Sequence, residues 1–314
     1  MHQIAIQRSI KAIQFSNSQA DFTNLKQLSQ EIFSQLDIST TTTKDYQYRI
    51  KSFLHFIESH GFKNNTYLAF KKELADLPNI SVATKNKYLI SAKVFLKELF
   101  RQGLIPIDIT SNIKGFNQSR KHKKQGLNDR EVLKVIEYCN SLVRTPQNMR
   151  LKAIVALLTL QGLRQIEVIR LNVKDLDFAQ MVAFVRGKGQ DDREPIYLHP
   201  RTVRILKQYL KECKVKDGAL FRSRSNNSRN ARLTTKSIRC IVKSMFEVLN
   251  IDRSTHGFRH YFTTKLVKHY KGDLLMVSQY TRHKSLEMLQ VYNDAIIQQE
   301  DLPNFYEAFN EIRL

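Results

Sequence analysis

The stretch His256-Gly257-Phe258-Arg259-His260 opens the most informative segment of the chain, which continues through Arg282-His283 to Tyr292. On a helix that begins near Thr255, residues 256, 259 and 260 stand at i, i+3 and i+4, so two imidazoles and one guanidinium share a face. A guanidinium matches phosphate oxygens with a fixed fork of donors, and histidine can hydrogen-bond an oxyanion or move a proton near neutral pH. Tyr292 then has the chemistry of a nucleophile toward phosphorus. A basic surface helix with an ordinary half-buried tyrosine explains the same residues, so the rest of the chain must decide.

The charge balance indicates a polyanionic partner. The 314 residues include 51 Lys and Arg against 29 Asp and Glu, which gives a net charge of +22. Such an excess repels itself unless a polyanion neutralises it, so nucleic acid is the first partner to consider. The net charge is +7 up to residue 120 and +15 beyond it, so we expect both halves to contact the polyanion. A membrane surface is the second candidate, but no apolar run approaches the roughly 20 residues of a spanning helix.

The cysteines and the N-terminus favour a cytoplasmic protein. Cys139, Cys213 and Cys240 are scattered and form no Cys-x-x-Cys pair, so we expect buried free thiols in a reducing compartment. Arg8 and Lys11 interrupt the apolar residues of the first 16 positions, which is not the pattern of a secretory signal.

The length predicts two domains, and the first half carries two apolar stripes with helical spacing. We expect a helical domain over residues 40–114, with a shorter apolar segment at Tyr67–Leu77 between the stripes. Residues 1–39 form an N-terminal extension, either one amphipathic helix around Leu25 and Phe33 or an arm that folds on a partner. The stripes are Tyr46, Ile50, Phe53, Leu54 and Ile57, ending at Gly61, and Tyr88, Ala92, Phe95, Leu96 and Leu99, ending at Gly103.

Basic residues follow the polar faces of these helices and the segment after them. Residues 115–127 read as a linker with Gly at both ends and no apolar period. Its charge run lies either along a groove of a duplex or on a solvated face. Residues 221–232 mix arginines with Ser and Asn, which suits phosphate contacts and also suits a surface loop. The candidate DNA-binding residues are Lys44, Arg49, Lys85, Lys87, Arg120, Lys121, Lys123, Arg222 and Arg224.

The second half, residues 128–296, reads as a mixed domain. Asn128 and Glu131 form a capping-box signature, and the helix at Met149–Leu160 is almost wholly apolar. It leads into Gly162-Leu163-Arg164, with Glu167 one turn later, a pair that a local salt bridge alone explains equally well. Further expected elements are strands at 182–185 and 195–198, with a third near 176–178, and helices at 201–211 and 234–249. Lys188 lies between two glycines in the strand connection.

Taken in order, Arg164, Lys188, His256, Arg259, His283 and Tyr292 resemble the tyrosine recombinase (phage integrase) family. The resemblance covers roughly residues 40–300, and each motif is modest while the ordered set is specific. One departure is visible, because the family usually has Leu-Gly before the second histidine and this chain has Thr281-Arg282. The resemblance implies a mainly α fold with a small β-sheet. A helical core-binding domain and an α/β catalytic domain would form a C-shaped clamp on DNA.

The resemblance also implies roles for the site residues. Arg164 and Arg259 would bind the non-bridging phosphate oxygens, with His256 and His283 donating further hydrogen bonds. Tyr292 would attack phosphorus, and Lys188 would protonate the leaving 5′-oxygen. Glu167 and His260 would support the site. Four protomers would exchange strands through a Holliday junction, in integration, excision or dimer resolution.

Other functions explain some of the same residues, and the C-terminal segment has two possible docking sites. A type IB topoisomerase uses a similar site, and an architectural DNA-binding protein would explain the charge without chemistry. His256 and His260 have a spacing that fits zinc, but no carboxylate or cysteine lies near them, so we expect no metal and no cofactor. Residues 297–314 carry an apolar stripe, and we expect a tail helix that docks either on its own domain or on a neighbouring copy. The stripe is Leu302, Phe305, Phe309 and Ile312.

Overall fold

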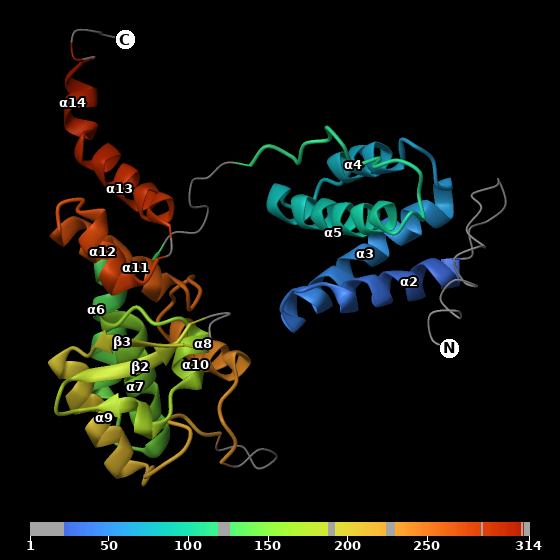
Figure 1. The fold of residues 1–314 in the computed structure, drawn as a ribbon. Helices are drawn as coiled ribbons and strands as arrows, with labels where there is room; N and C mark the ends of the chain where they lie inside the picture. The colour runs from blue at the N-terminus through green and yellow to red at the C-terminus, as the bar shows by residue number, and fades with distance from the viewer. Residues whose placement is uncertain are drawn as a thin grey trace. The chain divides into compact units, whose positions relative to one another are not determined.

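The computed structural model of the chain describes residues 22–118, 126–187, 192–223, 230–283, 285–308 and Asn310. The chain divides into two compact units, residues 1–119 and 120–314 (Figure 1). The first is helical and the second combines helices with one small sheet. The predicted fold class, mainly α with a small β-sheet, is therefore confirmed.

Unit 1 forms around the two helices that carry the apolar stripes. In both, the hydroxyl of a serine before the helix accepts a hydrogen bond from the third residue on, Ser39 from Thr42 and Ser81 from Thr84, which satisfies an otherwise unpaired N–H. The core between the helices is rich in buried phenylalanine. The helices are α2 (Phe22–Gln35), α3 (Thr40–His60), α4 (Thr66–Asp76) and α5 (Val82–Arg101).

Helix α2 belongs to this helical core. Leu25, Ile32 and Phe33 are buried, and Phe33 packs against Tyr46 and Phe95 at ring-centroid distances of 5.5 and 6.2 Å. Of the two alternatives for this segment, the structure thus has the amphipathic helix. The helical domain that we expected to start at residue 40 therefore leaves out α2, whose apolar face packs against α3 and α5 in the same core.

Unit 2 is built around helix α7, which is apolar on nearly every face and contacts α6, α8, α9, α10 and α11. A helix of this kind is stable only when other elements cover it on all sides. Its helices are α6 (Asp129–Ser141), α7 (Pro146–Leu160), α8 (Gln165–Arg170), α9 (Pro200–Glu212), α10 (Thr235–Val248), α11 (Gly257–His269), α12 (Leu274–Thr281), α13 (Leu286–Glu300) and α14 (Leu302–Glu307), with a 3-10 turn at Val173–Asp175.

The sheet of unit 2 is antiparallel, in the order β1 (Leu176–Asp177), β2 (Val182–Arg186) and β3 (Arg193–Tyr197). Ala183 pairs with Leu176 on one side and with Ile196 on the other. Ala183, Val185 and Ile196 are buried in the unit 2 core. The last pair of β2 and β3 is Arg186 with Arg193, and the connection between them carries Lys188. Lys188 itself lies outside the described residues.

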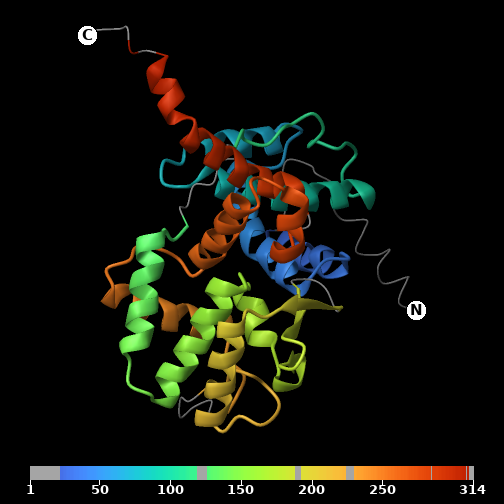
Figure 2. The same ribbon diagram turned by 90° about the vertical axis from the view of Figure 1, so that its left-hand side faces the viewer.

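Helices α11, α12 and α13 form a second, smaller core at one end of unit 2 (Figure 2). Val267 of α11, Val277 of α12 and Leu289 of α13 are fully enclosed, and Tyr292 packs with them. Helix α13 continues to Glu300, so the expected boundary at residue 297 falls inside a helix. Helix α14 follows after Asp301 and has no buried residue; in Figure 1 it projects from the rest of unit 2.

Candidate active site

The turn after α7 places Arg164 beside α11. Gly162 has φ +58°, and a Cβ there would lie 2.2 Å from Cδ1 of Phe262 on α11. Glycine alone permits both this backbone conformation and this close approach. Arg164 follows directly before α8.

Arg164 and Glu167 form an ion pair, and Glu167 also accepts a hydrogen bond from the backbone of Arg164. Arg164 donates from Nη1 to Oε1 of Glu167 at 2.9 Å, and its backbone N–H donates to Oε2 at 2.7 Å. The Glu167 side chain is only 1% exposed, whereas that of Arg164 is 33% exposed. The guanidinium is therefore held on one side and open on the other, where an anion could approach.

Arg259 on α11 is buried and donates to two backbone carbonyls. Nη1 donates to the carbonyl of Gly162 at 2.7 Å, and Nη2 donates to that of Thr281 at 2.5 Å. Burial, together with the charge of Arg164, lowers the pKa of Arg259 to about 10, so the side chain stays cationic near neutral pH. These bonds tie α11 to the α7–α8 turn and to the end of α12.

His283 lies directly after that end of α12. Its Nδ1 is 2.7 Å from the hydroxyl oxygen of Thr281. Burial, with the charges of Arg259 and Arg164, lowers the pKa of His283 to about 3. The imidazole is thus neutral near pH 7 and can donate one N–H to an oxyanion without bringing a further charge.

Tyr292 on α13 contacts the histidines of α11. Its hydroxyl oxygen is 2.5 Å from Nδ1 of His260, and the ring of His260 meets that of His256 edge-on at a centroid distance of 4.7 Å. The ring of His283 lies 6.4 Å from that of Tyr292. Burial raises the pKa of Tyr292 to about 12, while the charge of Arg259 acts to lower it.

The structure thus brings five of the six candidate catalytic residues into one site and leaves Lys188 outside the described residues. Supporting residues Glu167 and His260 lie in the same site. Sequence reasoning missed the contacts of Thr281 and Arg282, which pack into the site between Arg259 and His283. The five residues are Arg164, His256, Arg259, His283 and Tyr292.

The candidate DNA-binding residues divide into exposed and engaged side chains. Lys44 and Lys87 are exposed. The exposed face expected for Lys85 is wrong: Lys85 is 9% exposed and its Nζ donates to the carbonyl of Ala75 at 2.7 Å, because the ammonium satisfies a carbonyl at the end of α4.

Two arginines of the same set are also engaged. Arg49 donates twice to the carboxylate of Asp45, at 2.8 and 3.0 Å. Arg222 pairs with Asp217 at 2.9 Å. Their guanidiniums are held in place rather than extended into solvent. The remaining members of the set, Arg120, Lys121, Lys123 and Arg224, lie outside the described residues.

Two findings in the described part of the chain bear on metal ions and on membrane-spanning helices. There, no three His, Cys, Asp or Glu side chains gather in a way that could hold a metal ion. None of the helices that the structure describes is long and apolar enough to cross a membrane.

The three cysteines are free thiols, and only Cys139 is buried. Cys240 is exposed on the outer face of α10, so the expectation of burial is wrong for this residue.

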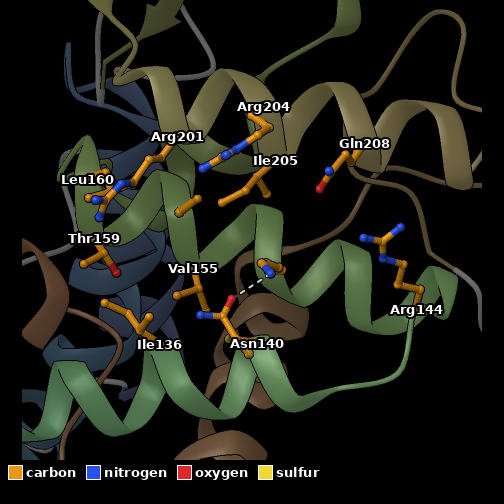
Figure 3. Close-up of a pocket in the computed structure, with 13 residues that line it drawn as sticks. Ile136, Asn140, Arg144, Val155, Thr159, Leu160, Arg201, Arg204, Ile205 and Gln208 are labelled. Carbon is orange, nitrogen blue, oxygen red and sulfur yellow. Dashed lines mark hydrogen bonds between the residues drawn. The ribbon is translucent and has the colours of Figure 1, made fainter.

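A separate pocket of about 480 Å³ lies between α6, α7 and α9 (Figure 3). Apolar side chains such as Val155 form its floor, and the described residues that line it include no acidic side chain. Thr159, 7% exposed, has a hydroxyl with no hydrogen-bond partner in the described part of the chain. The basic residues around the pocket are Arg144, Lys152, Arg201 and Arg204.

Comparison with known proteins identifies the family. A model of the phage integrase family matches residues 125–298, more than half of the chain. The chain belongs to the phage integrase family. Among similar proteins is tyrosine recombinase XerC of Oceanobacillus iheyensis, which is 27% identical over 267 residues, 81% of this chain and 85% of the relative. Tyrosine recombinase XerD of the same organism is 26% identical over 304 residues, 84% of this chain and 98% of the relative.

Solved structures share the fold of this integrase family member. The XerH site-specific recombinase bound to palindromic difH substrate, in a post-cleavage complex, has a TM-score of 0.76 at 18% identity and covers 92% of this chain and 98% of its own. A lambda integrase tetramer bound to a Holliday junction has a TM-score of 0.66 at 13% identity, over 93% of this chain and 85% of its own. At these identities the likeness is one of fold.

Proposed function

We propose that this chain is a site-specific DNA recombinase that cleaves and rejoins strands through a covalent bond between Tyr292 and a 3′-phosphate. Membership of the phage integrase family supports recombination as the activity. The observation that carries the residue assignment is the contact between Tyr292 and His260, 2.5 Å apart, in a site where the charge of Arg259 also acts on the phenol. The same chemistry serves integration, excision or dimer resolution.

The cleavage step needs no metal in this proposal. The phenol oxygen of Tyr292 attacks phosphorus and gives its proton to His260. The bond from phosphorus to the 5′-oxygen breaks, and that oxygen takes a proton, the role that the family resemblance gives to Lys188. Arg164 and Arg259 stabilise the charge that grows on the non-bridging oxygens. Since Arg259 already donates to two carbonyls, Arg164 offers the more open guanidinium.

His256 and His283 complete the set as donors to the same oxygens. The neutral state of His283 suits hydrogen-bond donation, because it adds no charge that the surrounding guanidiniums would oppose. Rejoining is the same reaction in reverse, with the 5′-hydroxyl of another strand as the nucleophile. The phosphotyrosine bond keeps the energy of the phosphodiester, so the exchange requires no nucleotide cofactor.

We propose double-stranded DNA as the partner, contacted by both units. The net charge of +22 supports this partner. Lys44 and Lys87, which are exposed, are the members of the unit 1 set available for phosphate contacts. By analogy with the lambda integrase tetramer on a Holliday junction, four copies would act on two sites.

Assembly would use the tail helix. Helix α14 has no buried residue, and Phe305 and Tyr306 are 55% and 60% exposed. Residues 300–307 hold three acidic and no basic side chains. An acidic and aromatic segment complements a pocket with an apolar floor and a basic rim, which is the character of the pocket between α6, α7 and α9 (Figure 3). We therefore place the tail of a neighbouring copy in that pocket.

Covalent trapping tests the chemistry. Incubating the chain with a library of nicked duplexes should yield a protein–DNA adduct that survives a denaturing gel, and sequencing the captured DNA identifies the target. Tyr292→Phe should bind the captured site and form no adduct. Tyr280→Phe changes a partly exposed phenol on α12 and should leave the adduct intact. An adduct in the Tyr292→Phe variant would refute the assignment.

The product separates recombination from its alternatives. A plasmid with two copies of the captured site should give recombinant circles. A topoisomerase-like enzyme would give relaxed circles alone, and an architectural protein would give neither product.

A further inference from the structure

Arg282 occupies an unusual backbone position at the edge of the site. It ends α12 with φ 54° and ψ 44°, and its N–H donates to the carbonyl of Ser278 at 2.7 Å. A left-handed conformation is strained for a non-glycine residue, because its Cβ crowds the following carbonyl oxygen. Glycine would adopt it freely, and glycine is what the family resemblance leads one to expect there.

The side chain of Arg282 is also unusual, because it points inward. Six other non-glycine residues in the described part of the chain have positive φ, and all six are exposed. The Arg282 side chain is only 9% exposed. Burying a guanidinium on a strained backbone is costly unless the charge is paired, so the interaction that it makes must offset both costs.

The partner of Arg282 is Glu167. Nη2 of Arg282 donates to Oε2 of Glu167 at 2.8 Å, while Oε1 of the same carboxylate accepts from Arg164 at 2.9 Å. One buried carboxylate is thus shared by two guanidiniums. Nε of Arg282 also lies 3.8 Å from Oε2 of Glu194 on β3, so Arg282 links the end of α12 to α8 and to the strand that follows the Lys188 connection.

The sharing affects what Arg164 can do. A carboxylate with a single arginine partner can take it in a bidentate fork, which would occupy both terminal nitrogens of Arg164. Oε2 of Glu167 is engaged by Arg282 and by the backbone N–H of Arg164, so Glu167 holds the Arg164 side chain through Nη1 at Oε1 alone, and that side chain stays 33% exposed. The site also keeps a net positive charge, since the three guanidiniums of Arg164, Arg259 and Arg282 outnumber the two carboxylates of Glu167 and Glu194. Consistent with this, the charge of Arg282 contributes to the lowered pKa values of Arg259 and His283.

We propose that Arg282 is a positioning residue for strand cleavage: it engages one oxygen of Glu167 so that Arg164 is presented to the scissile phosphate in a site with excess positive charge. The proposal rests on the function proposed above. It gives the site a third guanidinium, at a turn where the family resemblance leads one to expect glycine.

The test uses Arg282→Gly, which removes the side chain and at the same time relieves the backbone. A purely structural role predicts unimpaired cleavage, because glycine suits the left-handed turn. A positioning role predicts unchanged binding of the captured site and single-turnover cleavage slower by roughly tenfold or more, about 1.4 kcal/mol of barrier. Arg282→Asn, which also tolerates this backbone, should show the same loss and guards against a defect specific to glycine.

Two comparisons make the result specific. Lys271→Gly changes an exposed residue with φ 48° in the same way and should cleave normally. A substrate with a neutral methylphosphonate at the scissile position carries less charge for the site to stabilise, so the deficit of Arg282→Gly should shrink there. Wild-type cleavage by Arg282→Gly, or an equal deficit on both substrates, would overturn the inference while the wild-type adduct still upholds the proposed function. A wild-type chain that forms no adduct would refute both.

Discussion

The hydroxyl oxygen of Tyr292 lies 2.5 Å from Nδ1 of His260, across the interface between α13 and α11. Burial raises the pKa of Tyr292 to about 12, so the phenol is protonated at neutral pH. A protonated phenol is a weak nucleophile and needs a base within hydrogen-bond reach. His260 is in that position, whereas His256, the first histidine of the motif, meets Tyr292 through the ring of His260.

We predict that His260→Ala slows cleavage at neutral pH by about 100-fold, the lower range for loss of a general base. The deficit should narrow as the pH rises, because the unassisted phenol then ionises directly and the variant gains about tenfold for each pH unit below its pKa. The measurement is the pH dependence of single-turnover cleavage on the captured site. His269→Ala, at an exposed histidine on the same helix, is the control. Parallel pH profiles for wild type and His260→Ala would exclude His260 as the base.

For Arg164→Lys we predict cleavage slower by at least roughly tenfold, or about 1.4 kcal/mol. Lysine keeps the charge and loses the planar fork that holds Glu167 and phosphate together. Affinity for the captured site should change little, since the total charge is constant. Single-turnover cleavage and binding measured on the same duplex separate the two effects, and a near-normal rate would remove Arg164 from the site.

His283 should make the stability of unit 2 sensitive to acid. Its pKa is lowered from 6.5 to about 3, so between these values the unfolded chain binds a proton that the folded chain does not. The stability is complete above about pH 6.5 and is lost as the pH falls toward 3. From about pH 7.5 to 5.5 the free energy of unfolding should fall by about 1 kcal/mol more in wild type than in His283→Gln.

Hydrogen exchange of α11 amides, corrected for the intrinsic pH dependence of exchange, reports this difference for unit 2 alone. The substitution also removes the hydrogen bond to Thr281, and comparing the change in stability with pH, rather than the stability itself, cancels the constant contribution of that bond. The exposed His269→Gln variant should follow wild type. If His283→Gln loses as much stability as wild type over this range, His283 is not held neutral.

The helices of unit 1 were predictable because their signals are local. Each stripe and its glycine lie within one continuous segment of about four helical turns, and α3 and α5 end where the stripes indicate. Burial of Lys85 was not predictable. Its ammonium reaches a carbonyl of α4, ten residues earlier, and that contact exists only after the helices pack.

The order of motifs in the sequence was enough to identify the candidate catalytic residues. It was not enough to predict which of these side chains contact one another. Which histidine meets Tyr292 depends on how α13 packs on α11, and no local pattern encodes that packing. The contact between Arg282 and Glu167 spans 115 residues of sequence. The only sequence signal was an arginine where the resemblance leads one to expect glycine, and that signal gave the place of the anomaly without its partner.

Gly162→Ala should destabilise unit 2 by about 3 kcal/mol, from roughly 1–2 kcal/mol of left-handed strain and roughly 1–3 kcal/mol of overpacking. The added Cβ would meet the ring of Phe262 at 2.2 Å. Gly218→Ala is a matched control, because Gly218 has φ +62° and its Cβ would meet only the end of the Arg222 side chain, at 3.0 Å. It should cost about 1 kcal/mol. Equal losses of unfolding free energy in the two variants would show that Phe262 yields without cost.

If the tail of a neighbouring copy fills the pocket between α6, α7 and α9, removing the tail and altering the pocket should have the same effect on assembly. Truncation after Asp301 removes α14, and Arg204→Glu reverses a charge at the pocket rim. Each should weaken the complex of two DNA sites by about tenfold and leave binding to one site nearly unchanged. Arg239→Glu makes the same charge change on the exposed face of α10, outside the pocket, and is the control.

The combined variant decides between docking in trans and two unrelated effects. Changes that remove one shared contact are not additive, so truncation together with Arg204→Glu should weaken pairing no more than truncation alone. The measurement is a gel-shift titration that resolves one-site from two-site complexes, at a single salt concentration because phosphate contacts are salt-dependent. Independent losses that multiply would place the tail elsewhere, and unchanged pairing after truncation would mean that α14 docks on its own domain.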